Sequence, residues 1–193
     1  MIQYLWENIL NKKDKENDVI TFLKNTYLFK DLNSSEIKFL EQIIHIRDFR
    51  PNERIFKQGD PGLGMFLIFS GSVDIIMHDP KSDGLESTEE IFVTRLKAGD
   101  FFGELSLVEE PSYRSASAVS INRSRLIGFF KPDLVQILQR NSHTGNKISM
   151  RLAEILGRRL RETTEKVTEL AAEMKQLNNP SKGQNLGKKH FTS

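Results

Sequence analysis

The apolar residues of this chain change their spacing twice, near Arg47 and near Lys131. Before Arg47 and after Lys131 the apolar residues recur at helical intervals. Between these two positions short apolar runs alternate with turn residues. The runs that we predict as strands are Arg54–Lys57, Met65–Ser70, Val73–His78, Ile91–Leu96, Ala116–Ile121 and Ser124–Phe130. Several short strands at this spacing predict a mainly β protein with flanking helices, built as a β-sandwich or β-roll.

The helical segments divide the rest of the chain. Two helices are predicted between Asp18 and Ile46, and a short one from Pro132 to Leu138. A long helix is predicted from near Asn146 to about Asn178. The expected divisions are an amphipathic N-terminal helix with a linker at 1–17, the β-roll with its helices at 18–140, the long helix at 141–178, and a polar, disordered tail at 179–193.

The predicted long helix carries an apolar seam whose spacings alternate between four and three residues. Its members are Leu156, Leu160, Thr163, Val167, Leu170, Met174 and Leu177. This spacing is typical of a coiled coil, and a helix of this length extends beyond a domain of this size. We favour a parallel homodimer through this seam over packing within the chain.

Composition narrows the classes of function. With 193 residues, 38% of them apolar, the chain is expected to form one domain with a small appendage. It contains no cysteine, which excludes a disulfide framework and a thiol nucleophile, and its four histidines are scattered, so no metal site is expected. A net charge of +2 is too small to predict non-specific nucleic-acid binding. No signal peptide or membrane span is recognisable, so a cytoplasmic protein is expected.

The stretch Phe101–Ala118 combines residue types that suit one small anionic ligand. Arg114 offers a planar fork for two phosphate oxygens, and Ser115 adds a hydroxyl or amide donor. Gly103 permits a close approach of the backbone, and Glu104 can accept a hydrogen bond from a sugar hydroxyl. The alternative interpretation is an ion pair between Glu104 and Arg114 that holds two strands together and binds nothing.

Two further groups of residues carry a resemblance to a known family. Between Arg50 and Phe130 the chain contains Pro-Asn-Glu-Arg-Ile-Phe-Lys-Gln-Gly-Asp, Met-Phe-Leu-Ile-Phe-Ser-Gly-Ser-Val, Phe-Gly-Glu-Leu-Ser-Leu and Arg-Ser-Ala. In this order and at these intervals, the motifs resemble a cyclic-nucleotide-binding domain with its phosphate-binding cassette. Residues 156–167, Leu-Gly-Arg-Arg-Leu-Arg-Glu-Thr-Thr-Glu-Lys-Val, resemble the dimer helix of the bacterial catabolite activator (Crp/Fnr-like, cyclic-AMP receptor) family.

The resemblance implies a jelly-roll sensor domain and a set of ligand-binding residues. The set is Gly103, Glu104, Leu105, Arg114, Ser115, Arg159, Thr163 and Thr164. In this set the cassette holds ribose and phosphate, and Arg159 braces Glu104. Thr163 and Thr164 meet the adenine edge, one of them from the opposite subunit. Threonine hydroxyls favour adenine without excluding guanine, so cyclic AMP is the expected ligand and cyclic GMP the second option. Without the resemblance, Thr163 is equally a packing residue of the seam.

In the catabolite activator family the dimer helix leads into a helix-turn-helix domain, and this sequence ends about where that domain is expected to begin. The expected function is therefore a stand-alone, homodimeric cyclic-AMP receptor that repositions its long helix and signals through an unknown effector protein. It is expected to have no enzymatic activity, no cofactor, and no direct sequence-specific DNA binding. The alternatives are a dimeric module that ignores nucleotides, and a regulator that associates with DNA indirectly through its basic tail.

Overall fold

The computed structural model describes residues 18–78 and 90–178. The predictions for residues 1–17 and 179–193 therefore lie outside the described residues. The chain divides into two compact units, Met1–Leu152 and Ala153–Ser193, and the boundary falls inside the long helix α4 (Ser142–Asn178). Each unit is described by itself below.

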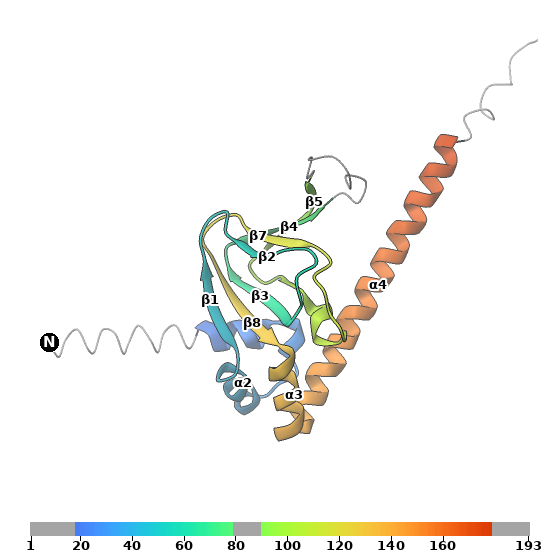
Figure 1. Cartoon of the computed structure of the whole chain (residues 1–193). Helices are drawn as coiled ribbons and strands as arrows, with labels where there is room; N and C mark the ends of the chain where they lie inside the picture. The colour runs from blue at the N-terminus through green and yellow to red at the C-terminus, as the bar shows by residue number, and fades with distance from the viewer. Residues whose placement is uncertain (1–17, 79–89, 179–193) are drawn as a thin grey trace, which may run out of the picture. The chain divides into compact units, whose positions relative to one another are not determined.

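The first unit is built around two antiparallel sheets of four strands each (Figure 1). One sheet has the order β1 (His45–Phe49), β8 (Ser124–Phe130), β3 (Gly64–Ser70) and β6 (Phe101–Phe102). The other has the order β2 (Arg54–Phe56), β7 (Ser117–Ser120), β4 (Ser72–His78) and β5 (Glu90–Lys97). The non-consecutive strand order is that of a jelly roll, so the predicted β-roll is confirmed, and all six predicted strands are present.

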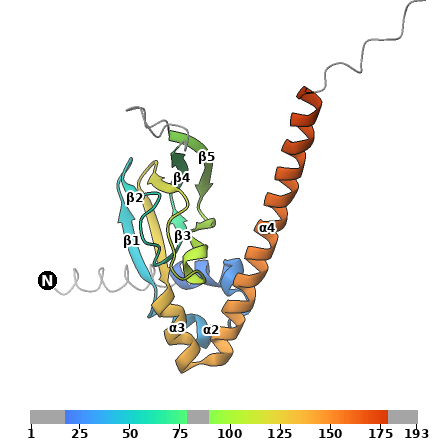
Figure 2. The ribbon, with the colours of Figure 1, turned by 45° about the vertical axis from the view of Figure 1, so that its right-hand side comes forward.

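Helices lie at one end of the roll, where α2 and α3 are found in both views (Figure 2). The described helical elements of this unit are residues 18–25, η1 (Tyr27–Phe29), α2 (Ser34–Glu41), η3 (Glu104–Leu107), α3 (Lys131–Arg140) and the first turns of α4. Asn33 caps α2 by accepting hydrogen bonds from the amides of Ser35 and Glu36, as its residue type favours. The short helix predicted after Lys131 is confirmed as α3.

The second predicted helix was wrong at its end. It was expected to reach Ile46, but α2 stops at Glu41 and His45 already begins β1. Ile43 and Ile44 continue the helical spacing in the sequence, yet they form the connection between the two elements. The reason is tertiary: β1 pairs with β8 along its whole length, and this pairing outweighs the local helical preference.

A polar joint fixes the first turns of α4 to α2 within the same unit. The buried carboxylate of Glu36 accepts hydrogen bonds from the Thr144 hydroxyl at 2.9 Å and from Lys147 Nζ at 2.9 and 3.0 Å. It also accepts one from the backbone amide of Asn33 at 2.7 Å. Burial by itself raises the pKa of Glu36, but the hydrogen bonds from Lys147, Asn33 and Thr144 outweigh it, so the pKa lies below its ordinary value.

The described part of the second unit is the remainder of α4. Its seam residues from Leu160 onward are exposed in the single chain, whereas Leu156 is half-buried. The exposed residues include Leu160 at 69% and Leu177 at 79% exposure, with Val167, Leu170 and Met174 between them. No helix in the described ranges is both long enough and apolar enough to cross a membrane.

Candidate functional site

The predicted anion-binding stretch begins at β6 and ends at β7. Gly103 follows β6 with a left-handed φ of 78°, a conformation that glycine adopts without strain, and it starts the short helix η3. The chain then returns towards residues 59–62. There the Arg114 amide donates to Asp60 O at 2.8 Å, and the Gly59 amide donates to Arg114 O at 2.8 Å. These two bonds fix the backbone of Arg114 beside the segment that precedes β3.

Arg114 is buried, and one nitrogen of its guanidinium carries all of its side-chain hydrogen bonds to described residues. Nη1 donates to Gly64 O at 2.7 Å, to Ser106 Oγ at 3.2 Å and to Gly103 O at 3.4 Å. The guanidinium carbon lies 4.1 Å from the centre of the Phe56 ring, a cation–π distance. These contacts hold the side chain in one orientation.

The aromatic rings beside the Arg114 guanidinium belong to the core of the roll. The rings of Phe56, Phe66 and Phe102 pack against one another with centroids 5.7 to 6.3 Å apart. Phe102 is buried with Phe49, Ile68, Val73, Ala118 and Leu126 in one hydrophobic cluster. The same packing that stabilises the fold therefore positions the guanidinium.

Gly103 leaves room for Arg114 in addition to adopting its left-handed backbone angle. A Cβ on residue 103 would lie 2.4 Å from Arg114 Nη1, so the guanidinium would have to shift away from its present position. We predicted that this glycine lets the backbone approach a ligand. The structure adds a second reason, because the absence of a side chain leaves room for the guanidinium.

The other edge of the guanidinium differs from Nη1 in its hydrogen bonding. Arg114 Nε is buried and has no hydrogen-bond partner among the described residues, and none of them bonds to Nη2. Burial lowers the pKa of Arg114, and the charges of Asp60 and Glu104 offset part of this effect. A buried donor without a partner costs free energy, which an anionic acceptor at this edge would recover. The Nε–Nη2 edge has the shape that binds two oxygens of one phosphate.

The other predicted cassette residues lie around this guanidinium in different settings. Glu104 is buried at the start of η3, whereas Leu105 and Ser115 are exposed. The hydrogen bonds of Arg114 to described residues go to two carbonyls and a hydroxyl, and Glu104 acts on it through its charge.

Arg159, Thr163 and Thr164 lie on the second unit, in the part of α4 after Ala153. The hydroxyl of Thr163 donates to Arg159 O, and that of Thr164 donates to Leu160 O, each at 2.8 Å. Both threonines are exposed in the single chain, and their hydroxyl oxygens keep lone pairs for a further partner. That these three residues meet a ligand at the cassette stays a prediction.

Sequence reasoning missed three residues that hold Arg114, namely Phe56, Gly64 and Ser106. Phe56 and Gly64 are more than forty positions away in the chain, and no local pattern connects them with Arg114. Ser106 gave a weak signal, as a polar residue between Leu105 and Leu107 inside an otherwise apolar run. Its hydroxyl also accepts a hydrogen bond from the Ser112 hydroxyl at 3.0 Å, which ties the two ends of the loop together.

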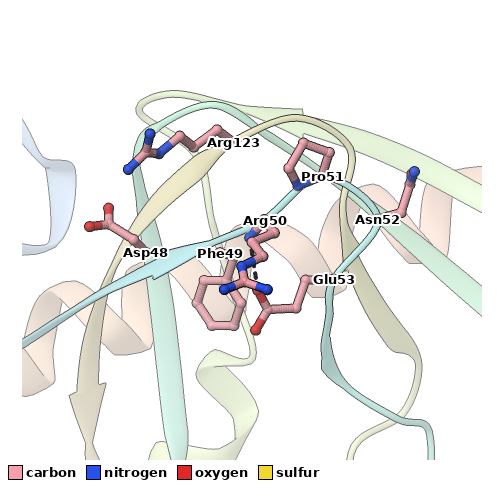
Figure 3. Close-up of a pocket in the computed structure, with 7 residues that line it drawn as sticks. All are labelled: Asp48, Phe49, Arg50, Pro51, Asn52, Glu53 and Arg123. Carbon is pink, nitrogen blue, oxygen red and sulfur yellow. Dashed lines mark hydrogen bonds between the residues drawn. The ribbon is translucent and has the colours of Figure 1, made fainter.

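A shallow pocket elsewhere on the first unit does not coincide with this site (Figure 3). It is lined by Asp48, Phe49, Arg50, Pro51, Asn52, Glu53 and Arg123, at the turn between β1 and β2. Its two carboxylates already have partners: Asp48 pairs with Arg125 at 2.8 Å, and Glu53 accepts from the Arg50 amide at 2.8 Å. The pocket shares no residue with the predicted ligand-binding set.

Comparison with known proteins identifies a domain family that covers the β-roll. Residues 46–141 match the family model described as "Cyclic nucleotide-binding domain". The chain is 32% identical over 140 residues to the cyclic AMP receptor protein of Thermus thermophilus. This alignment covers 72% of this chain and 60% of that protein. The chain thus spans less than two thirds of the length of this relative.

Two solved structures share the architecture. The catabolite activator protein of Thermus thermophilus aligns with a TM-score of 0.64 and 29% identity, over 76% of this chain and 63% of that one. A cyclic nucleotide-binding domain from Methylobacillus flagellatus aligns with a TM-score of 0.67 and 22% identity, over 91% of this chain and 86% of that one. The second likeness concerns the fold alone.

Proposed function

Residues 46–141 belong to the cyclic nucleotide-binding domain family, and from this premise we propose that the chain is a cyclic AMP receptor that couples ligand binding to its long helix. The chain is homologous to cyclic AMP receptor and catabolite activator proteins. The observation that carries the proposal is the buried guanidinium of Arg114, which is held by Nη1 while its Nε has no partner among the described residues.

The phosphate end of the ligand fits the charge and shape of the cassette. A cyclic phosphate is a monoanion with two exocyclic oxygens, and the Nε–Nη2 edge of Arg114 can donate to both. Ser115, the next residue, is exposed and can add a hydroxyl or amide donor. Because the guanidinium is already oriented by Phe56 and Gly64, binding requires little reorganisation of this side chain.

Ribose and base are assigned to two other groups of residues. We propose that Glu104 accepts a hydrogen bond from the ribose 2′-hydroxyl, while Gly103 and Leu105 line the same end of the ligand. Arg159 braces Glu104, and Thr163 and Thr164 recognise the edge of the base. Cyclic AMP is the favoured ligand because the similar Thermus thermophilus protein is named for it, and cyclic GMP is the competitor to test.

Output is proposed to pass through a homodimer. The exposed stripe of Leu160, Val167, Leu170, Met174 and Leu177 has coiled-coil spacing, and a second copy of the same helix would cover it. Because Thr163 and Thr164 lie on this helix, ligand occupancy and helix arrangement would be thermodynamically linked. An effector protein, still to be identified, would recognise the rearranged helices.

The test is calorimetric titration of the purified chain with cyclic AMP and with cyclic GMP, alongside Arg114→Leu. Binding by the wild type with a preference for cyclic AMP, and its loss in Arg114→Leu, are expected. The melting temperature of each ligand-free protein serves as the folding control. If the folded wild type binds neither nucleotide, the chain is a nucleotide-insensitive module. Equal binding by Arg114→Leu would show that the phosphate site is assigned wrongly.

A further inference from the structure

Lys131, the first residue of α3, connects three segments of the first unit. Its backbone amide donates to Leu63 O at 2.9 Å. Its side-chain Nζ donates to Glu109 O at 2.9 Å and forms an ion pair with the carboxylate of Glu110. One residue therefore joins the start of α3 to the chain before β3 and to the loop that follows η3.

The loop after η3 is joined to α3 through Lys131. Residues 108–111 are all exposed, and the amides of Val108 and Glu109 bond back to Leu105 O inside the same turn. In the part of the chain that the structure describes, the hydrogen bonds from residues 108–111 to any other element all end on Lys131. The far end of the loop is fixed separately, because the Gly62 amide donates to Ser112 O at 2.9 Å.

The contacts of Lys131 lie next to those of Arg114. Leu63 O accepts from the amide of Lys131, and the next carbonyl, Gly64 O, accepts from Arg114 Nη1. The loop held by Lys131 also leads within four residues to Arg114 itself. In the other direction α3 ends at Arg140, and α4 begins after a single intervening residue, Asn141. A displacement of the loop is thus passed to α3 through direct bonds.

We propose that Lys131 is a positioning residue, a strut that sets the loop 108–111 against α3 and links the phosphate cassette to the helices. Lys131 makes these contacts in the ligand-free chain. Its effect on nucleotide binding rests on the proposed function, because it presupposes that the chain binds a nucleotide. When a bound nucleotide reduces the motion of the cassette, the bonds of Lys131 also reduce the motion of the first turn of α3. Without Lys131 the cassette binds more weakly, and α3 no longer responds to the ligand.

The first arm of the test uses the full chain without ligand. Amide hydrogen exchange is compared between wild type, Lys131→Met and Lys131→Arg, with Arg125→Met as control. Arg125 forms a surface ion pair with Asp48 away from the cassette, so its loss matches the charge change. Lys131→Met should speed exchange in peptides covering 104–114 by about two- to fivefold, the range expected for an exposed ion pair with one added hydrogen bond. Lys131→Arg should restore slow exchange, and Arg125→Met should leave these peptides unchanged.

Unchanged hydrogen exchange in Lys131→Met would show that Lys131 does not position the loop. Equal changes in Lys131→Met and Arg125→Met would show that the effect comes from the general surface charge.

The second arm titrates the same proteins with cyclic AMP. Lys131→Met should bind about two- to fivefold more weakly, and ligand-induced protection of residues 131–140 should be lost. If wild type binds and Lys131→Met keeps both affinity and helix protection, the link is wrong although the receptor function stands. If wild type does not bind, the receptor function fails, and the first arm alone decides on the strut.

Discussion

Replacing Arg114 by lysine separates the charge of this residue from its geometry. The substitution keeps one positive charge above Phe56, but lysine has a single nitrogen where arginine has three. Gly64 O at 2.7 Å and Ser106 Oγ at 3.2 Å are the strongest acceptors near Nη1, and the ammonium group is expected to satisfy them first. In the lysine variant nothing replaces the Nε–Nη2 edge that we propose to bind the phosphate.

The expected loss is at least one charge-assisted hydrogen bond, about 1.5–3 kcal/mol, which weakens cyclic AMP binding about 10- to 150-fold. Calorimetric titration measures this ratio. The ligand-free midpoint of thermal unfolding should fall by less than about 4 °C, equivalent to about 1 kcal/mol for a chain of this size. Arg125→Lys, which alters an arginine paired with Asp48, serves as the control and should bind normally.

Binding by Arg114→Lys within about twofold of wild type would refute the reasoning, because charge alone would then be sufficient. A weakened affinity accompanied by a much larger loss of ligand-free stability would also contradict it. That outcome would mean that Arg114 serves the fold before it serves the ligand.

Three further predictions concern other parts of the molecule. Ser106→Ala removes the hydroxyl that joins Arg114 to Ser112, so calorimetry should show cyclic AMP binding weaker by about 0.5–1.5 kcal/mol. The pKa of Glu36 lies below its ordinary value of 4.5, so its stabilising contribution is complete above that pH and is lost as the pH falls through the lower, folded-state pKa. Urea unfolding should accordingly show wild type losing stability below about pH 4.5 more steeply than Glu36→Gln. Leu170→Asp places a charge in the exposed stripe of α4, and light scattering should show the mass changing from dimer to monomer.

The fold was predictable where local pattern and tertiary structure agree. The strand at Ser124–Phe130 was placed without error, because a β-rich run there is bounded by a turn on one side and Pro132 on the other. The strand at His45–Phe49 was missed because four of its five residues are exposed and show no alternation. Its pairing with β8 is a long-range property that single-sequence spacing does not contain.

The site was predictable to the extent that it is local. Gly103, Glu104 and Arg114 lie within twelve positions, so the loop that brings them together could be inferred from residue types. Phe56 and Gly64 reach Arg114 only through the packing of other strands. The apolar run Ile91–Val93 shows the converse limit. Its residue types do not reveal its exposure: all three residues are exposed on β5, which lies at the edge of its sheet.

The burial of Arg114 has a consequence for how nucleotide affinity is measured. Its guanidinium is buried and has therefore lost part of its hydration in the ligand-free protein, and this burial lowers its pKa. If the Nε edge binds the nucleotide phosphate as proposed, a small inorganic anion that reaches this edge would restore some of that lost solvation. Sulfate or phosphate in a buffer would then compete with the nucleotide for the same donor. This competition adds to the general screening of charge by salt. Titrations at equal ionic strength in chloride and in sulfate therefore report different constants, and the difference measures how well the cassette holds an anion without its sugar and base.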